Sequence, residues 1–178
     1  SWCPGPRSTR ARVFYAMTIA AQVLETARQQ GLMIVTAESC TGGMVASALT
    51  EIAGASSVVE RGFVTYTNAA KREMLSVCAT TLDEHGAVSE AVAREMAQGA
   101  LKHSHADIAV SITGIAGPGG SEFKPEGRVC FGLATQSGSR AKTIDFGALG
   151  RSAVRSSACE HALLLLLDTM KSRSGAAR

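Results

Sequence analysis

Aromatic residues are scarce in this sequence: one Trp, two Tyr and five Phe make up only 4% of its 178 residues. The net charge is a modest +3, and no basic stripe interleaves with aromatic side chains, so nucleic-acid binding has no support. Long apolar runs are also missing. The longest aliphatic run, Ala162 to Leu167, is far shorter than the roughly 20 residues that span a bilayer. We therefore expect neither a nucleic acid nor a membrane as a partner.

Paired cysteines are absent as well. The five cysteines form no C-x-x-C pair and have no histidine at metal-ligand spacing; they are Cys3, Cys40, Cys78, Cys130 and Cys159. Such a distribution does not indicate a zinc site or a disulfide framework. Reduced thiols are the simpler interpretation, and they are typical of a cytoplasmic protein. We expect a cytoplasmic location and no metal ion.

What the chain does have is the composition of a soluble globular domain, with 46% hydrophobic and 19% charged residues. Residues 1–16 resemble neither a signal peptide nor a core element, and Met17 resembles a natural start. We expect residues 1–16 to be a disordered extension, residues 17–172 to form a single domain, and residues 173–178 to be a flexible tail.

Hydrophobic periodicity alternates between the helical and the extended pattern along the chain. Helices are predicted over 18–30, 41–52, 68–77, 88–103 and 151–170, and strands over 32–37, 57–67, 107–113, 128–135 and 142–146. The last two strands are joined by a hairpin-like segment, 136–140. The alternation predicts an α/β fold, and specifically a three-layer α/β/α sandwich. Its sheet should be mixed but mostly parallel, because only the late hairpin is antiparallel.

The most informative stretch is Thr36-Ala-Glu-Ser-Cys-Thr-Gly-Gly43, which follows the apolar run 32–35 and precedes the apolar residues 44–49. This order indicates a strand, a tight turn and a helix, and α/β proteins bind ligands at the carboxyl ends of strands. Ser39, Cys40 and Thr41 would then lie at a helix N-terminus with free backbone N–H groups. The small residues Gly42 and Gly43 would let a ligand approach that terminus.

A serine hydroxyl needs a base in contact before it can act as a nucleophile. No Asp/Glu–His pair is placed to serve Ser39, and we expect all four histidines (His85, His103, His105 and His161) to be structural or solvated. Lys71 is a candidate base if burial lowers its pKa. Tyr66 and Asn68 could orient it or relay a proton, and Asn68 could also cap the following helix. The alternative, that Lys71 is an ordinary surface lysine, stays open.

Two further alternatives concern the same turn. Cys40 could be the nucleophile, because a thiol at a helix N-terminus has a lowered pKa. It has no identifiable partner, however, and a small buried packing residue is the other interpretation. Glu38 could orient a donor or cap the helix.

Anion-binding groups are suggested in two places. The glycine-dense loop 114–120 follows a strand and could approach a phosphate or an oxyanion, although it lacks the P-loop lysine and could be a plain turn. Arg151 and Arg155 lie one helical turn apart and could present two guanidinium groups to a phosphate. Two solvated arginines are the alternative.

Four long motifs resemble one known family. They are Ala37-Glu-Ser-Cys-Thr-Gly-Gly43, Glu60-Arg-Gly-Phe-Val-Thr-Tyr-Thr-Asn-Ala-Ala-Lys71, His85-Gly-Ala-Val-Ser-Glu90 and Ser111-Ile-Thr-Gly-Ile-Ala-Gly-Pro-Gly-Gly120. In this order they resemble the nicotinamide-nucleotide amidases, the carboxy-terminal domain of the competence/damage-inducible CinA proteins. The resemblance covers residues 20 to 170. It implies deamidation of nicotinamide mononucleotide to nicotinic acid mononucleotide and ammonia in pyridine-nucleotide recycling, with no cofactor.

The resemblance also implies roles for residues. Ser39 matches the nucleophile and Lys71 the lysine that activates it, with Tyr66 close by. Contacts to the substrate or its oxyanion are expected from Cys40, Thr41, Gly42, Gly43, Asn68, Thr113, Gly114, Gly117 and Arg151. The expected partner is a small nucleotide substrate, and self-association into a homo-oligomer is left open. A Ser–Lys hydrolase acting on another amide or ester, or a silent domain that binds a nucleotide or a DNA-uptake partner, are the alternatives.

Overall fold

The computed structural model describes residues 17–175. Its centre is one sheet of five strands in the order β2-β1-β3-β4-β5. The strands are β1 (Ile34–Glu38), β2 (Val59–Val64), β3 (Ile108–Gly114), β4 (Arg128–Thr135) and β5 (Gly138–Asp145). Residues 1–16, where we predicted a disordered extension, lie outside the described residues, as do residues 176–178 of the predicted tail.

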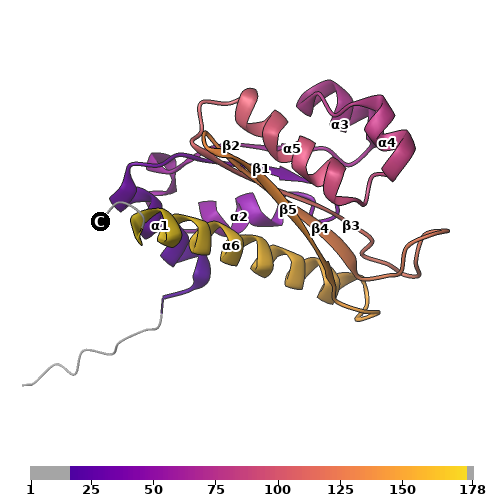
Figure 1. Cartoon of the computed structure of the whole chain (residues 1–178). Helices are drawn as coiled ribbons and strands as arrows, with labels where there is room; N and C mark the ends of the chain where they lie inside the picture. The colour runs from indigo at the N-terminus through magenta and orange to yellow at the C-terminus, as the bar shows by residue number, and fades with distance from the viewer. Residues whose placement is uncertain (1–16, 176–178) are drawn as a thin grey trace, which may run out of the picture.

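Helices cover both faces of this sheet (Figure 1). One layer holds α1 (Ile19–Gln30), α2 (Met44–Thr50) and α6 (Arg151–Gly175), and the other holds α3 (Asn68–Leu75), α4 (Ala79–His85) and α5 (Glu90–Lys102). A single 3₁₀ turn, η1 (Ala55–Ser57), precedes β2. The prediction of a three-layer α/β/α sandwich is confirmed.

The sheet is mixed and mostly parallel, as predicted, because β4 alone runs against the direction of the other four strands. Strand β1 pairs in parallel with both β2 and β3, whereas β4 runs antiparallel to both β3 and β5. The hairpin strand β4 therefore contributes both antiparallel pairings. The carboxyl ends of the three parallel strands meet at one edge, where the chain continues into Ser39, Thr65 and Ile115.

The two layers enclose separate apolar cores. Strands β1 and β3 are buried almost throughout, as expected for strands covered on both faces. The core under α1, α2 and α6 includes Val23, Leu24, Leu49, Val110, Phe131 and Leu166, and the core under α3, α4 and α5 includes Val35, Leu75, Val92, Met96 and Ala109. Together they hold the carboxyl edge of the sheet in place from both sides.

The second predicted helix begins later than expected. It starts at Met44 instead of residue 41, because Gly43 has a φ of 106°, a conformation that a helix does not accommodate. Ser39 is thus followed by a turn before α2 begins. The short helix α4 was not predicted, since only Leu82 of its seven residues is buried and the helical period is weak.

The C-terminal elements are longer than predicted. Strand β5 starts at Gly138, not at residue 142, because the hairpin uses a two-residue turn at 136–137. Helix α6 runs on to Gly175, past the predicted end at Met170 and into the predicted tail. Its last turns pack on α1, where the side-chain amide of Gln30 donates to the Met170 carbonyl at 2.8 Å and to Ser174 Oγ at 2.7 Å.

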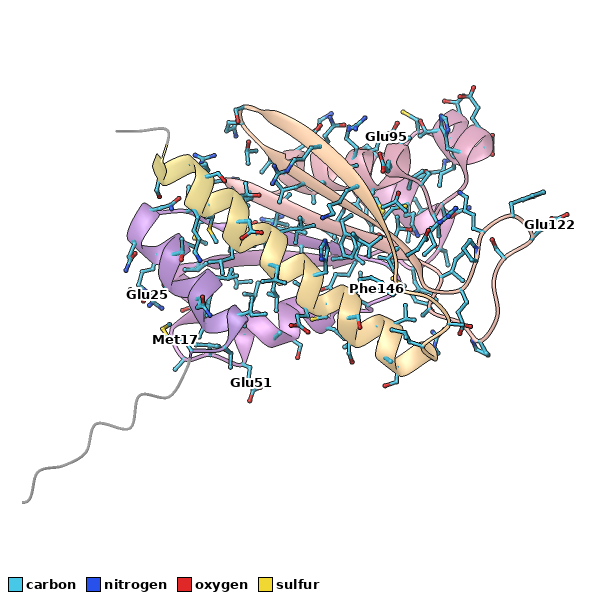
Figure 2. The ribbon with its side chains drawn as sticks, turned by 60° about the horizontal axis from the view of Figure 1, so that its bottom comes forward. Met17, Glu25, Glu51, Glu95, Glu122 and Phe146 are labelled. Atoms are coloured by element: carbon cyan, nitrogen blue, oxygen red, sulfur yellow. The ribbon has the colours of Figure 1, made fainter. Side chains whose placement is uncertain are left out.

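Both ends of the described chain lie away from the carboxyl edge of the sheet. Figure 2 shows Met17 and Glu122 at opposite ends of the molecule. Glu122 belongs to the loop between β3 and β4, which extends from the carboxyl edge. Within residues 17–175, no helix combines the length and the apolar character needed to cross a membrane.

His161 on α6 is a buried titratable residue that makes the stability of the fold depend on pH. Its ring packs against Phe131 at a centroid distance of 4.6 Å and against Phe146 at 6.4 Å, and its buried Nε2 has no hydrogen-bond partner within residues 17–175. Burial lowers the pKa of His161, and the charge of Lys142 lowers it further, while Asp168 acts in the opposite direction. The neutral ring is therefore the form that the fold prefers.

We expect the protein to lose stability as the pH falls below about 6.5, the ordinary histidine pKa, towards the lower pKa of the folded state. One proton limits the slope to about 1.4 kcal/mol per pH unit, and the partial exposure of His161 makes it smaller. Thermal unfolding between pH 5 and 7.5 measures it. The variant His161→Phe should flatten this dependence; an unchanged slope in that variant would assign the effect to other groups.

Candidate active site

Ser39 and Lys71 meet at the carboxyl edge of the sheet. Ser39 follows directly on β1, and Lys71 lies in the first turns of α3. Lys71 Nζ is 3.0 Å from Ser39 Oγ, 2.9 Å from the Thr65 carbonyl and 3.3 Å from the Tyr66 carbonyl. Only 1% of Lys71 and 8% of Ser39 is exposed. The alternative of a surface lysine is thereby excluded.

The surroundings of Lys71 favour a neutral amine. Burial lowers the pKa of its ammonium group, and only a thiolate at Cys40 would act in the opposite direction. A neutral amine has two N–H groups and one lone pair. Because the carbonyls of Thr65 and Tyr66 can accept from the two N–H groups, the lone pair is left to accept the hydroxyl proton of Ser39. This arrangement has the geometry of a nucleophile and its base.

Glu38 does not neutralise Lys71, although it is adjacent to Ser39 in sequence. Its side chain is fully buried, and its two oxygens accept the backbone N–H groups of Val45 at 2.9 Å and Ala46 at 3.1 Å. Glu38 thus caps the first turn of α2, which was one of the two roles considered from the sequence. The carboxylate anchors the turn that carries Ser39 to that helix.

Cys40 is buried beside Ser39, with 5% of its surface exposed. Burial raises the pKa of its thiol to about 11, in spite of the nearby positive charge of Arg155. The thiol is therefore protonated near neutral pH, and a thiol is a much weaker nucleophile than a thiolate. The geometry favours Cys40 as a packing residue and Ser39 as the nucleophile.

Backbone N–H groups surround Ser39 in a turn rather than in the first turn of a helix. The Gly42 N–H donates to the Ser39 carbonyl at 3.0 Å, so it is not free for a ligand. Neither Cys40 nor Thr41 donates its N–H to another residue in the described range, 17–175. Thr41 is fully buried, so the predicted set of donors from Cys40 to Gly42 is reduced to the N–H group of Cys40.

Tyr66 is placed differently from its predicted role. Its side chain is 56% exposed, and its hydroxyl accepts a hydrogen bond from Arg151 Nη2 at 2.8 Å. It reaches Lys71 only through its backbone carbonyl, so the phenol is not positioned to relay a proton. Asn68 is exposed and does not cap α3; Thr67 does, by accepting the Ala70 N–H at 3.0 Å.

A pocket of about 380 Å³ opens above the Ser39–Lys71 pair, a volume suited to a small molecule. The predicted site residues that line it are Ser39, Cys40, Tyr66, Asn68, Lys71, Thr113, Gly114, Gly117 and Arg151. Thr41, Gly42 and Gly43 are not among its lining residues. Within residues 17–175, no group of three or more His, Cys, Asp or Glu side chains is arranged to hold a metal ion.

One wall of the pocket was not predicted. Ala87 and Val88, from the turn between α4 and α5, line it beside the end of β3. Thr113 Oγ1 donates to the Ala87 carbonyl at 2.8 Å, and Lys124 Nζ donates to the carbonyls of His85, at 2.7 Å, and Val88. The motif 85–90 was visible in the sequence, but its contribution is made by backbone contacts that side-chain chemistry does not reveal.

Arg151 and Arg155 do not act as one anion site. Arg151 donates to the Gly117 carbonyl at 2.8 Å and lines the pocket. Arg155 turns to the other side of the Ser39 turn, where its Nε donates to the Cys40 carbonyl at 3.0 Å and its Nη2 to the Thr41 carbonyl at 3.3 Å. The prediction that both arginines bind one phosphate is wrong, because the two guanidinium groups point in different directions.

In class, this is an α/β/α protein in which a serine hydroxyl and a buried lysine amine are in contact beside a pocket of small-molecule size. Comparison with known proteins agrees with that class. The model of the CinA C-terminal domain family matches residues 16–170, and the chain belongs to this family.

Named relatives support the assignment. The chain is 52% identical over 151 residues to the nicotinamide-nucleotide amidohydrolase PncC of Escherichia coli K12, covering 84% of this chain and 92% of that protein. The solved competence/damage-inducible protein CihA of Agrobacterium tumefaciens has a TM-score of 0.82 at 49% identity and covers 84% of this chain and 92% of its own. A CinA superfamily protein of Klebsiella pneumoniae has a TM-score of 0.83 at 36% identity. The match covers 86% of this chain and 96% of that protein.

Proposed function

We propose that this protein hydrolyses the carboxamide of nicotinamide mononucleotide to nicotinic acid mononucleotide and ammonia. The observation that carries the proposal is the 3.0 Å contact between the buried Lys71 amine and the Ser39 hydroxyl at the base of the pocket. The name of the E. coli relative, a nicotinamide-nucleotide amidohydrolase, supports the choice of this nucleotide as the substrate. The reaction would be part of pyridine-nucleotide recycling.

Acylation of Ser39 is the first half of the proposed reaction. Ser39 Oγ attacks the carboxamide carbon while Lys71 accepts the hydroxyl proton, and the carbonyl π electrons move to oxygen. The N–H group of Cys40, a residue that lines the pocket, stabilises the oxyanion that develops. When the tetrahedral intermediate collapses, the C–N bond breaks and Lys71 passes its proton to the leaving amine. Ammonia departs, and an ester to Ser39 remains.

Hydrolysis of that ester is the second half. Lys71 takes a proton from water, and the resulting hydroxide equivalent attacks the ester carbon. The C–O bond to Ser39 breaks, Ser39 Oγ recovers the proton from Lys71, and the carboxylate product leaves. The same base thus serves both halves, and no cofactor enters the scheme.

Arg151 is the proposed partner of the substrate phosphate. The residues that line this pocket include two basic side chains, Lys71 and Arg151. The two contacts of Arg151, to the Gly117 carbonyl and the Tyr66 hydroxyl, hold its guanidinium at the pocket wall and leave further N–H groups for a ligand. Thr113, Gly114 and Asn68 are proposed to contact the ribose side.

Replacing Arg151 with methionine should raise the KM for nicotinamide mononucleotide about tenfold or more, since hydrogen bonds to charged groups contribute about 1.5–3 kcal/mol. The KM for nicotinamide riboside, which has no phosphate, should be unaffected. Steady-state ammonia release measures both. Lys171→Met, at the exposed far end of α6, is the matched control.

The function itself is tested by the same assay on the wild-type protein. Ammonia release from the nucleotide that far exceeds release from the riboside supports the proposal, whereas no release from either substrate refutes it. The cytoplasmic location, the single domain over 17–172 and any homo-oligomer remain predictions.

A further inference from the structure

Lys124, in the loop between β3 and β4, makes contacts that the proposed reaction does not use. Its side chain is half-buried and reaches the turn between α4 and α5, where Nζ donates to the carbonyls of His85, at 2.7 Å, and Val88. A Cβ built on Gly86 would lie 3.2 Å from this Nζ, so the ammonium group packs directly against the turn. No carboxylate pairs with Lys124 within residues 17–175. Its charge is therefore directed at the peptide oxygens of the turn.

This turn, residues 86–89, is hydrogen-bonded to β3 and the loop after it through side chains. Thr113 Oγ1 donates to the Ala87 carbonyl at 2.8 Å, and Lys124 supplies the two other contacts. In the described part of the chain, no backbone hydrogen bond joins the turn to β3 or to that loop. The backbone of Lys124 is itself held, because its carbonyl accepts the Ser121 N–H at 2.8 Å and its N–H donates to Ser121 Oγ at 3.2 Å. The position of the turn thus depends on Thr113 and Lys124.

The turn lies on the same face of the sheet as the Ser39 hydroxyl. Strands β1 and β3 are paired to the end of β1, and the Ser39 N–H donates to the Ile112 carbonyl at 2.9 Å, so Ser39 and Thr113 lie side by side. Both side chains point to the layer of α3, α4 and α5, since one contacts Lys71 on α3 and the other contacts the turn. The turn therefore forms the pocket wall next to the nucleophile.

The chemistry of this wall suits a ring rather than a phosphate. The side chains of its lining residues, Ala87 and Val88, are aliphatic, and their carbonyls are already engaged by Thr113 and Lys124. Aliphatic walls of this kind bind the apolar faces of small ligands. The pyridine ring carries the carboxamide that Ser39 attacks, so it must lie next to the nucleophile and hence next to this wall.

We infer that Lys124 is a positioning residue for substrate binding: by binding the carbonyls of His85 and Val88, it holds the Ala87–Val88 wall against the pyridine ring. The inference rests on the proposed amidase function. Because Lys124 acts through the wall and not on the reacting atoms, its effect on the substrate and on the transition state should be equal. Such uniform binding changes KM and leaves kcat as it is.

The test compares Lys124→Met with the wild-type protein, with Lys171→Met as the control. We expect the KM to rise about tenfold for both nicotinamide mononucleotide and nicotinamide riboside, because both contain the ring and two charged hydrogen bonds are lost. The pH midpoint and kcat should stay in place, because Ser39 and Lys71 are untouched. Arg151→Met, in contrast, should raise the KM for the nucleotide alone.

The split between KM and kcat separates this role from a purely structural one. A general loosening of the protein would lower kcat as well, so a fall in kcat as large as the rise in KM overturns the inference. Unchanged KM values for both substrates in folded Lys124→Met overturn it too. If the wild type itself releases no ammonia, the proposed function fails instead, and the two failures are thereby distinguished.

Val88→Ala tests the wall directly and guards against a Lys124 variant that fails to fold. It removes two methyl groups from the wall, so the KM for both substrates should rise up to about tenfold with kcat unchanged. In the double variant with Lys124→Met, the combined rise should be smaller than the product of the two single effects, because both act on the same contact. Full multiplication of the effects overturns the inference, as does an unchanged KM in Val88→Ala.

Discussion

Replacing Lys71 with methionine is expected to lower kcat for ammonia release about 10²–10⁴-fold, which is the contribution of a positioned general base. Methionine nearly fills the space of the lysine side chain but has no proton acceptor at its end. The loss should therefore appear in kcat, with the fold retained. Burial disfavours the lysine charge, so the variant should unfold at the same temperature as the wild type or a higher one.

The pH dependence of the wild type provides an independent check on Lys71. The amine must be neutral to accept the Ser39 proton, and burial lowers its pKa. Activity should therefore rise with pH, with a midpoint below the ordinary lysine pKa of about 10.4. Lys102→Met, an exposed lysine at the end of α5, should leave the profile unchanged.

Ser39→Ala should lose as much activity as Lys71→Met, and the double variant should lose little more, because the two residues act as one unit. Additive losses would show that they act separately. If the folded Lys71→Met variant keeps the kcat of the wild type, Lys71 has no part in the mechanism.

The second large effect concerns Gly132, in the middle of β4. A Cβ at this position would lie 2.1 Å from the Ala93 carbonyl oxygen and 2.4 Å from Ser111 Oγ. Helix α5 thus crosses β4 so closely that only glycine fits. Gly132→Ala should lower the free energy of unfolding by about 3 kcal/mol, since α5 must move away from the sheet.

For a chain of this length, that loss corresponds to a fall of about 6–12 °C in Tm. Thermal unfolding followed by circular dichroism measures it. Gly175→Ala adds the same methyl group where no atom lies within 4 Å, so it should leave Tm nearly unchanged. A Tm of Gly132→Ala equal to the wild type would mean that the α5–β4 packing relaxes at no cost.

Short sequence patterns predicted the parts of the site that are formed by neighbouring residues in the chain. The apolar run 32–35, the polar turn and the following apolar residues define a strand, a turn and a helix without reference to the rest of the chain. The contact between Ser39 and Lys71, 32 residues apart, was predicted from chemistry and from the family motifs, because a serine nucleophile requires a base.

The parts that were missed depend on how elements pack. The Thr65 and Tyr66 carbonyls that bind Lys71 are backbone groups, which no residue type identifies. The target of Arg155 depends on where α6 lies across the Ser39 turn, and helical spacing alone made it equivalent to Arg151. From the sequence, Tyr66 was expected to orient Lys71 or to relay a proton, whereas its phenol lies against Arg151.

The separation of the described chain ends from the pocket has a practical consequence. Met17 and the last turns of α6 lie at the end of the molecule opposite the β3–β4 loop that forms part of the pocket wall (Figure 2). Attachment to a solid support, or fusion to a second protein, through either end would leave the pocket mouth facing the solution. Surface-coupled protein should therefore take up small molecules as readily as protein that is free in solution.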